Sequence, residues 1–160
     1  MTDVIWRIEK AKRAASATSG EGGRVAGGRW TSPGYPAIYC AEHLSLAIVE
    51  VLVHAPGPRE RDVSRVRFRI RLDRALAERV PEKQIPRDFS PRTPYAITRA
   101  LGDAWLLSSR RPALSVPSAI VPTERNFILN PMHADFSRIL WHEHEPIMLD
   151  HRLWMAGPVT

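Results

Sequence analysis

Hydrophobic and polar positions alternate most regularly between residues 65 and 72. Four apolar residues there are interleaved with four arginines: Val66, Phe68, Ile70 and Leu72 with Arg65, Arg67, Arg69 and Arg71. A period of two is typical of a half-buried strand. We therefore predict a strand whose apolar face joins the core and whose arginine face is covered by water.

A denser apolar run, LSLAIVEVLV, spans residues 44–53 and ends before Pro56-Gly57. On a helical wheel, one face carries Leu44, Ala47, Ile48, Val51 and Leu52, and most of the other carries Leu46, Val49 and Val53. A helix that is apolar on nearly all sides is expected to be buried. Glu50 is its only charged residue. Burying a carboxylate without partners is costly, so Glu50 either serves a function, pairs with an arginine, or occupies an exposed strip of the helix.

The remaining pattern consists of shorter segments. We expect strands over 4–8, 37–40, 113–116, 119–121, 127–129, 139–141 and 147–149, and a helical turn over 131–136. A helix is expected from Thr93-Pro94 to about Ser109, with Ile97, Leu101, Ala104 and Trp105 on one side. Many short strands with few helices predict an α+β fold rather than a doubly wound parallel sheet.

The irregular segments are too short to divide the chain. Residues 16–28 hold five glycines and residues 81–94 hold four prolines, and neither segment has the length of a domain linker. We therefore expect a single domain over residues 1–160, a length typical of one domain.

The formal net charge of +6 comes from 23 basic and 17 acidic residues, and only Lys10, Lys12 and Lys83 are lysines. Arginine suits phosphate and carboxylate ligands, so nucleic acid, a phosphate-bearing small molecule and an acidic protein all remain open as partners. The preference for arginine could equally reflect genome composition. The stripe over residues 65–71 lacks interleaved exposed aromatics, which disfavours nucleic acid as its ligand.

The sequence also indicates the compartment. Cys40 is the only cysteine, so no internal disulfide is possible. No apolar stretch reaches the roughly 18 residues of a membrane span. The start, MTDVIWRIEK, lacks the apolar core of a signal peptide. We expect a cytoplasmic protein that does not enter a membrane.

A candidate ligand site precedes the apolar helix. Gly27 and Gly28 would allow close approach of the backbone to a ligand, and Arg29 follows them where it could bind a phosphate. Tyr39 would offer a flat ring for stacking. A tight turn, a surface arginine and a core tyrosine would account for the same residues. The run has neither the Gly-Lys-Ser/Thr ending of a P-loop nor the context of a dinucleotide fingerprint.

A second cluster, His142-Glu143-His144, could bind a metal if it lay in a strand. Its spacing is not the helical His-Glu-x-x-His pattern, so we favour a solvated strand end, expect no metal and leave its role open. His133 is expected to anchor its loop, and Cys40 to be a small buried residue.

Three collinear segments carry a specific resemblance: GGRWTSPGYPAIYCAEHLSLAIVEVLVH, VPSAIVPTERNFILNPMHADF and IMLDHRLW. Together they resemble the RES-domain family, and the resemblance covers nearly the whole chain. The arginine, glutamate and serine of the family match Arg29, Glu50 and Ser118, and Tyr39 matches the accompanying tyrosine. Thr31 stands where asparagine is common, which we expect to leave the chemistry unchanged.

The resemblance implies an ADP-ribosyltransferase-like fold, with short mixed strands around an NAD⁺ cleft and NAD⁺ as substrate rather than prosthetic group. It also implies the toxin of a type II toxin–antitoxin pair. The partner would be an Xre-like antitoxin whose C-terminal toxin-binding domain blocks the active site. Nucleic acid would then be contacted only through the antitoxin.

The expected chemistry breaks the bond between nicotinamide and ribose through an oxocarbenium-like transition state. Glu50 would stabilise that cation from a dry helix, and Arg29 would bind the diphosphate or a ribose-phosphate. Tyr39 would stack on nicotinamide. Ser118 would hydrogen-bond substrate or Glu50, or simply shape a turn. Arg7 and Asn126 are weaker candidates for cleft-lining, NAD⁺-binding roles.

The acceptor of ADP-ribose stays open in the sequence: water gives a glycohydrolase, phosphate a phosphorylase and a side chain a transferase. Arginine-specific transferases typically carry a second glutamate two residues before the catalytic one. Ile48 occupies that position, which argues against arginine as acceptor. Two alternatives remain: ADP-ribosylation of a specific protein as the main activity, and a non-enzymatic basic module that binds nucleic acid with strong salt dependence.

Overall fold

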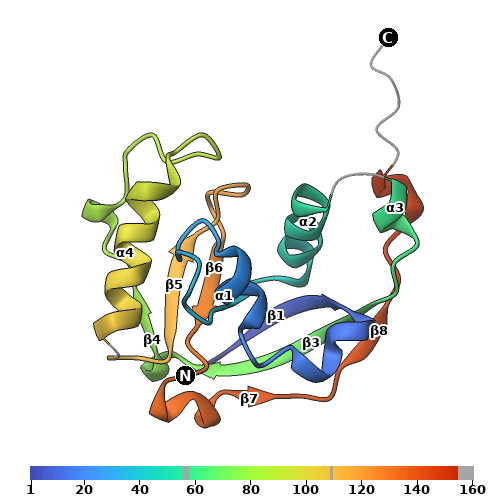
Figure 1. The fold of residues 1–160 in the computed structure, drawn as a ribbon, viewed down its shortest axis with the longest axis horizontal. Coiled ribbons are helices and arrows are strands. Elements are labelled where there is room, and N and C mark those ends of the chain that lie inside the picture. The colour runs from blue at the N-terminus through green and yellow to red at the C-terminus, as the bar shows by residue number, and fades with distance from the viewer. Residues whose placement is uncertain (56–57, 109, 155–160) are drawn as a thin grey trace.

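A computed structural model describes residues 1–55, 58–108 and 110–154 of the chain, and a mixed eight-stranded sheet organises it (Figure 1). The strands are β1 (Thr2–Lys10), β2 (Ile38–Ala41), β3 (Arg65–Asp73), β4 (Ala77–Arg79), β5 (Ala113–Pro117), β6 (Arg125–Leu129), β7 (Leu140–Trp141) and β8 (Glu145–Ile147). Their order is β4-β5-β6-β2-β1-β3-β7, with β8 also paired to β3. Of the strand pairs in the described residues, only β4 and β5 run parallel.

Four α-helices lie among the described residues: α1 (Glu21–Ala26), α2 (Leu44–His54), α3 (Pro58–Arg61) and α4 (Tyr95–Ser108). The 3-10 helices are η1 (Ala11–Ser16), η2 (Arg74–Leu76), η3 (Glu82–Gln84), η4 (Ala134–Arg138) and η5 (His151–Trp154). In Figure 1, α4 and α2 lie on opposite sides of β5 and β6. The expected α+β class is confirmed, whereas the single domain over residues 1–160 stays a prediction.

The sheet forks between β1 and β2. These two strands pair only where Trp6 faces Ala41. On one side of that point β2 pairs with β6 over residues 38–41, and on the other β1 pairs with β3 along its whole length. The sheet therefore consists of two halves, β4-β5-β6-β2 and β1-β3 with β7 and β8, joined by one residue pair.

The alternation in β3 places its four apolar side chains in the core, as predicted. Arg69 and Arg71 are exposed, but Arg65 is only 6% exposed. Its guanidinium donates to the Glu60 carboxylate at 2.8 Å and to the backbone oxygens of Glu60 and Val63. The prediction of a fully solvated arginine face is therefore wrong at Arg65, because Glu60 supplies a partner for the buried charge.

The helix predicted over residues 44–53 is present as α2, but its predicted burial is wrong. Only Leu46 and Ala47 are buried, and Val53 is 52% exposed. The apolar side chains of α2 have two different environments: one side of the helix packs on the sheet, and Val51 and Val53 line a cleft. The periodicity of the sequence cannot distinguish these two environments.

The face predicted for α4 is only partly right: Trp105 is buried and Leu101 packs against the same cluster, but Ile97 and Ala104 point to solvent. Ile97 is 44% exposed and Ala104 is exposed, while the buried residues are Thr98, Gly102, Trp105 and Leu106. Trp105 and Leu106 share a hydrophobic cluster with Leu114, Val116 and Ile128 of β5 and β6. Thr98 and Gly102 instead pack against a backbone segment, which an apolar-periodicity argument does not detect.

Five segments differ in detail from the predicted elements. The strand predicted over 119–121 is absent: Ser118 Oγ accepts the N–H groups of Ile120 and Val121, each at 3.1 Å, which closes a turn there instead. The closing strands are β7 and β8 rather than 139–141 and 147–149. The glycine-rich segment 16–28 contains α1, and the turn predicted over 131–136 is η4. Among the described residues, no helix is both long and apolar enough to cross a membrane.

Candidate functional site

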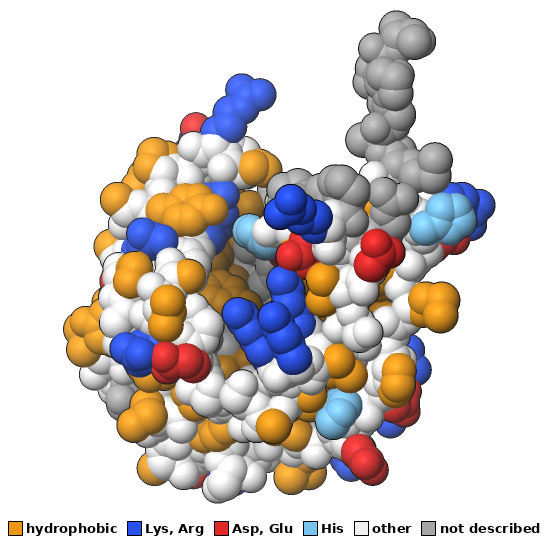
Figure 2. Space-filling view, turned by 45° about the vertical axis from the view of Figure 1, so that its right-hand side comes forward, with side chains coloured by type: hydrophobic (Ala, Val, Ile, Leu, Met, Phe, Trp, Pro, Cys, Tyr) orange, Lys and Arg blue, Asp and Glu red, His pale blue; other side chains and the backbone are white. Residues whose placement is uncertain are grey.

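A cleft of about 710 Å³ lies between the Gly27–Trp30 segment with α4 on one side and α2 on the other. Figure 2 shows the surface hollowed between these sides, with hydrophobic side chains deep inside and Lys or Arg side chains beside the opening. The volume lies within the roughly 300–1,000 Å³ of small-molecule sites. Five of the six residues predicted from the sequence line it: Arg7, Arg29, Tyr39, Glu50 and Asn126. The sixth, Ser118, is fully buried behind Glu50.

Glu50 is held by side chains from three elements. Its Oε1 accepts hydrogen bonds from Asn126 Nδ2 of β6 at 2.6 Å and from Ser118 Oγ at 3.4 Å. Its Oε2 lies 3.3 Å from His54 Nε2, one helical turn further along α2. The side chain is 23% exposed. The predicted dry environment is therefore wrong, and the carboxylate is instead fixed by hydrogen bonds at the edge of water.

The pKa values of Glu50 and His54 shift in opposite directions. Burial raises the pKa of Glu50, but hydrogen bonds from His54 and Asn126 outweigh it, so the net pKa lies below its ordinary value. The hydrogen bond to Glu50 raises the pKa of His54, against burial and the positive charge of Arg29. At neutral pH Glu50 is thus a carboxylate, and His54 is the neighbouring group that changes charge near neutrality.

His54 was missed by the sequence reasoning, although a signal was present. Residues three or four apart on a helix lie on the same face, so the residues at positions 46, 47, 53 and 54 are expected on the side of Glu50. Ala47 and Val53 do line the cleft, but they are apolar and could not bond a carboxylate. Position 46 is Leu46, which is buried, and position 54 is His54, which lines the cleft. The residue two before Glu50, Ile48, does not line it.

Ser118 combines the two roles considered for it. Its hydroxyl oxygen accepts the backbone N–H groups of Ile120 and Val121, and its one hydrogen is directed to Glu50 Oε1. Because the residue is 0% exposed, it has no direct access to the cleft. It shapes the turn and helps to orient the carboxylate.

Arg7 and Asn126 each carry a buried polar atom without a partner among the described residues. Arg7 donates through Nη1 to Tyr39 O at 2.9 Å and through Nη2 to Glu9 at 2.6 Å, which leaves Nε unpaired. Asn126 donates through Nδ2 to Glu50, which leaves Oδ1 unpaired. Both residues line the cleft. The two atoms themselves are closed to solvent, so they become available to a ligand that carries hydroxyl groups only when the side chains turn toward the cleft.

Tyr39 and Gly28 fit together closely. A Cβ atom added to Gly28 would lie 2.5 Å from the hydroxyl of Tyr39, so the segment requires glycine here. The Tyr39 hydroxyl accepts from Trp30 N at 3.2 Å and bonds Thr31 Oγ1 at 2.9 Å. Burial raises the pKa of Tyr39, so the phenol is neutral. The hydroxyl is occupied by the segment, and Tyr39 lines the cleft.

Arg29 is tied to the segment that leads into α4. Its Nη1 donates to Thr93 O at 3.0 Å and its Nη2 to Pro91 O at 2.8 Å. The guanidinium carbon lies 4.5 Å from the centre of the Tyr95 ring. Part of the hydrogen-bonding capacity predicted for a phosphate is thus spent on holding this loop.

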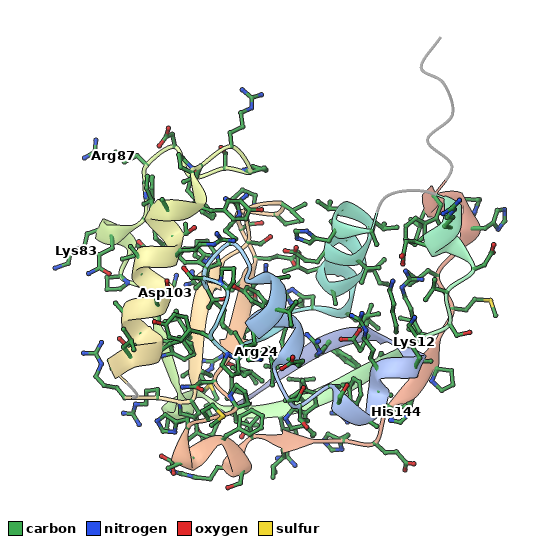
Figure 3. All side chains as sticks on the ribbon, in the orientation of Figure 1. Lys12, Arg24, Lys83, Arg87, Asp103 and His144 are labelled. Carbon is green, nitrogen blue, oxygen red and sulfur yellow. The ribbon has the colours of Figure 1, made fainter. Side chains whose placement is uncertain are left out.

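Helix α4 fixes the backbone of residues 28–32 through four of its own residues, none of which was predicted as part of a site. Arg99 Nε donates to Gly28 O at 2.8 Å, and Thr98 Oγ1 donates to Arg29 O. A Cβ on Gly102 would lie 1.7 Å from Trp30 O. Asp103, labelled on α4 in Figure 3, accepts from Ser32 N at 2.9 Å and Ser32 Oγ at 2.6 Å.

The other residues considered from the sequence lie apart from the cleft or serve structure. His142 and His144 are exposed in the coil between β7 and β8, with His144 at the end of the sheet far from α4 (Figure 3). The described residues include no group of three or more His, Cys, Asp or Glu side chains placed to hold a metal. His133 Nδ1 accepts from Asp135 N at 2.9 Å, as expected for a loop anchor. Burial raises the pKa of Cys40 to about 12, which agrees with a small buried residue.

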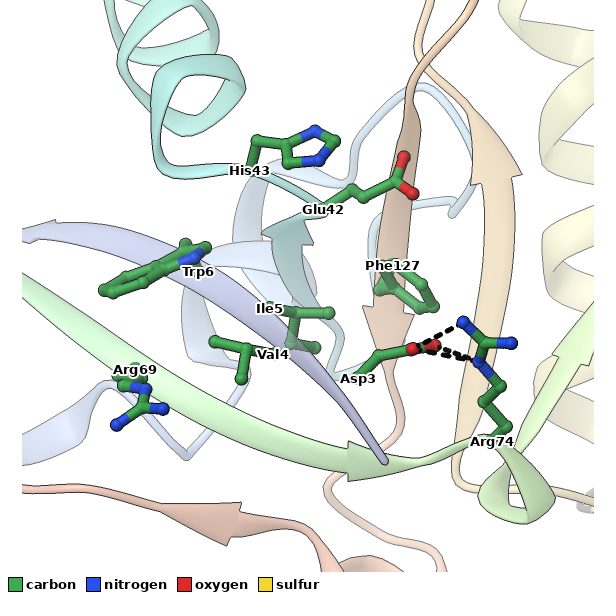
Figure 4. A pocket seen from close by; sticks show the side chains of 9 residues that line it. All are labelled: Asp3, Val4, Ile5, Trp6, Glu42, His43, Arg69, Arg74 and Phe127. Carbon is green, nitrogen blue, oxygen red and sulfur yellow. Dashed lines mark hydrogen bonds and ion pairs between the residues drawn. The ribbon is translucent and has the colours of Figure 1, made fainter. Parts of the chain in front are cut away.

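A second hollow, of about 430 Å³, lies beside Asp3, Glu42 and Arg74 (Figure 4). Three of its charged groups already have partners: Arg74 Nε donates to both Asp3 oxygens, and Glu42 accepts Arg125 N at 2.8 Å. The larger cleft is the candidate site, since only there do several predicted residues meet.

Sequence comparison shows the family to which this chain belongs. Residues 4–150 match the RES domain family, so the chain belongs to it and the resemblance seen in the sequence is confirmed. A relative from Photorhabdus laumondii named Toxin Res is 38% identical over 145 residues, 86% of this chain and 87% of its own. A relative from a Sphingobium strain, named Prs ADP-ribosylating toxin, is 30% identical over 158 residues, 96% of this chain and 98% of its own.

A solved structure shares the fold. A chain in the crystal structure of the M. tuberculosis MbcT–MbcA toxin–antitoxin complex superposes with a TM-score of 0.76 and 20% sequence identity. The match covers 96% of this chain and 87% of that chain. It confirms the expected ADP-ribosyltransferase-like α+β fold.

Proposed function

We propose that this protein is the toxin of a toxin–antitoxin pair and cleaves the nicotinamide–ribose bond of NAD⁺, passing ADP-ribose to water or phosphate. One observation carries the proposal: an ionised Glu50, an aromatic ring from Tyr39 and the cation Arg29 line one cleft of about 710 Å³. These are the groups needed for a cationic sugar, a flat leaving group and a diphosphate.

Glu50 would act on the ribose. Nicotinamide leaves as a neutral molecule, so the bond needs no general acid at that end, and the carbon left behind becomes oxocarbenium-like. A carboxylate that is already ionised and oriented by Asn126, Ser118 and His54 stabilises this charge without reorganising. Its lowered pKa keeps it charged at neutral pH.

The ribose hydroxyls would meet the two unpaired polar atoms of the cleft. Asn126 Oδ1 can accept a hydroxyl hydrogen, and Arg7 Nε can donate to a hydroxyl oxygen. Both residues are also bonded to other members of the site, Asn126 to Glu50 and Arg7 to the carbonyl of Tyr39. Because both atoms are closed to solvent, substrate binding would turn the two side chains toward the cleft and so complete these hydrogen bonds.

Tyr39 would stack on nicotinamide through its ring, since its hydroxyl is occupied and the residue lines the cleft. Aromatic stacking suits a flat heterocycle. Two residues before Glu50, Ile48 does not line the cleft, whereas His54 does. A second carboxylate for an arginine acceptor is therefore missing from α2, and His54 is placed to orient a small acceptor such as water or phosphate.

The antitoxin partner and the cytoplasmic location belong to the same proposal. The relatives named Toxin Res and the MbcT–MbcA complex support a protein antitoxin. The finer expectation is an Xre-like antitoxin with a C-terminal toxin-binding domain that closes the cleft, and through which alone nucleic acid is contacted.

The test is to incubate the purified protein with NAD⁺, with and without phosphate, and to identify products by mass spectrometry. Free ADP-ribose identifies a hydrolase, and a phosphorylated ADP-ribose identifies a phosphorylase. Glu50→Gln should lower kcat by roughly 10²–10³-fold, the effect of removing one preorganised electrostatic group. Glu145→Gln is the control, because Glu145 is 66% exposed and pairs with Arg67 outside the cleft. Equal turnover by wild type and Glu50→Gln would refute the mechanism.

A second candidate is ADP-ribosylation of a specific protein, supported by the relative named Prs ADP-ribosylating toxin, which matches 96% of this chain. Labelled NAD⁺ incubated with a bacterial lysate distinguishes the two. Label that enters a protein band, and is absent with Glu50→Gln, favours the transferase. Label recovered only in small molecules favours NAD⁺ degradation.

A further inference from the structure

Two arginines of the cleft share one aromatic ring. The guanidinium carbons of Arg29 and Arg99 lie 4.5 and 5.1 Å from the centre of the Tyr95 ring. Both arginines and Tyr95 line the cleft. Neither arginine pairs with a carboxylate in the part of the chain that the structure describes. Two cations gathered beside a cleft without an acidic partner favour an anionic ligand.

The two guanidinium groups differ in which of their nitrogens are still free to bind a ligand. Arg29 spends both terminal nitrogens on protein: Nη1 donates to Thr93 O and Nη2 to Pro91 O. Arg99 uses Nε, at 2.8 Å from Gly28 O. Among the described residues, neither terminal nitrogen of Arg99 has a partner. A guanidinium binds phosphate best with its paired N–H groups free.

We propose that Arg99 supplies the main charged contact to the diphosphate of the dinucleotide, and that Arg29 positions the 91–95 segment and Tyr95 around it. The bond from Arg99 Nε to Gly28 O fixes the direction of the side chain. The ring of Tyr95 supports both cations. This inference rests on the proposed function and changes the role expected for Arg29.

Arg99→Gln tests the inference through binding of ADP-ribose, measured by titration calorimetry. Losing a charged hydrogen bond costs about 1.5–3 kcal/mol, so the affinity should fall roughly 10–100-fold. KM for NAD⁺ should rise by a similar factor, while kcat at saturation stays within about threefold, as for a contact equally strong in ground and transition states. Arg99→Lys should recover part of the loss, since it keeps the charge.

Three variants separate ligand binding from support of the fold. Arg92→Gln removes an exposed positive charge from the same loop but not from the cleft, and should bind ADP-ribose as wild type does. Thr98→Val removes the neighbouring anchor on Arg29 O without removing a charge. Arg29→Gln should lower Tm and kcat together, because the 91–95 segment loses its anchor.

The decisive readout is salt dependence. ADP-ribose binding by wild type and Thr98→Val should weaken as ionic strength rises, and Arg99→Gln should show a flatter slope because one ionic contact is gone. An Arg99→Gln variant with wild-type affinity, or with weakened affinity and an unchanged salt slope, overturns the inference. A wild-type protein that binds ADP-ribose but does not consume NAD⁺ refutes the proposed function alone, and leaves the role of Arg99 measurable.

Discussion

The two walls of the cleft are built in different ways. On one wall, α4 holds the backbone of residues 28–32 through Thr98, Arg99 and Asp103, with Gly102 packed against the carbonyl of Trp30. On the other, α2 carries a carboxylate that is oriented by side chains alone. The first wall depends on close packing and the second on electrostatics, so substitutions in the two walls should change different measured properties of the protein.

The charges of the walls differ as well. The α4 wall presents Arg29 and Arg99 without a carboxylate partner among the described residues, and the α2 wall presents Glu50 beside a titrating His54. An NAD⁺ molecule that spans the cleft would place its anionic diphosphate at the first wall and its cation-forming ribose at the second. The comparison predicts loss of folding or of ligand affinity from the first wall, and loss or shift of rate from the second.

Gly102→Ala should have the largest effect, because the new Cβ would lie 1.7 Å from the backbone oxygen of Trp30. We expect the free energy of unfolding to fall by roughly 3 kcal/mol or more, measured by chemical denaturation. Gly22→Ala is the matched control on α1, where an added Cβ meets nothing within 4 Å. It should leave stability unchanged or raise it by about 0.5–1 kcal/mol. Equal stability of both variants would show that α4 does not press on this segment.

Asn126→Asp tests the second wall with a nearly isosteric change. It replaces an amide 2.6 Å from Glu50 Oε1 with a second carboxylate. Two adjacent carboxylates hold one proton more tightly, so the pKa of the pair rises. Turnover should fall as the pH drops through that raised pKa, with a loss of about 10–100-fold near neutrality.

The measurement is kcat/KM for NAD⁺ against pH. Gln84→Glu adds the same charge on exposed η3 and should keep the wild-type profile. An acid limb that stays in place in Asn126→Asp would mean that Asn126 does not adjoin Glu50 in the working enzyme.

His54→Gln should have the smallest effect. Protonated His54 partly neutralises the charge of Glu50, which would otherwise stabilise the cationic ribose. Wild-type kcat/KM should therefore rise with pH as His54 loses its proton. This proton is lost at a pKa raised above the ordinary value of about 6.5. The variant should lack this rise and differ from wild type by only about two- to fivefold at neutral pH. His43→Gln, an exposed pair with Glu124 outside the cleft, should retain the rise.

The raised pKa of His54 also makes the stability of the fold depend on pH. Because folding raises the pKa of His54, its charged pair with Glu50 contributes stability below the unfolded pKa and loses it as pH rises through the folded value. The contribution should be small, since the side chain is 68% exposed. Denaturation midpoints of wild type that fall from mildly acid to mildly alkaline pH, against a flatter curve for His54→Gln, would agree with this.

Much of the carboxylate wall could be predicted from the sequence. The isolated charge of Glu50 in an apolar run pointed to a constrained carboxylate, and the period of β3 pointed to a core strand. The degree of burial of α2 could not be predicted. Apolar residues such as Val51 and Val53 give the same sequence pattern whether they face a core or line a cleft. The lowered pKa of Glu50 depends on His54, one helical turn away, and on Asn126 and Ser118, which lie 76 and 68 residues away in sequence.

The α4 wall could not be predicted by the same reasoning. Thr98 and Asp103 bond residues 69 and 71 positions earlier, and Gly102 matters only because a carbonyl passes beside it. None of these contacts has a period or a motif. The false strand at residues 119–121 has a similar cause: the apolar residues suggested a ladder, but the hydroxyl of Ser118 had already bound two of the N–H groups it would need.

The fork in the sheet has a mechanical consequence. Past the pair of Trp6 and Ala41, no backbone ladder joins β1 to β2, and the strands are bridged instead by the guanidinium of Arg7, which reaches Tyr39 O at 2.9 Å. A second side-chain bond, from Asn126 to Glu50, ties β6 to α2. Two side-chain bonds therefore supplement the one backbone pair between the halves of the sheet, and single substitutions can loosen this junction while every strand keeps its register.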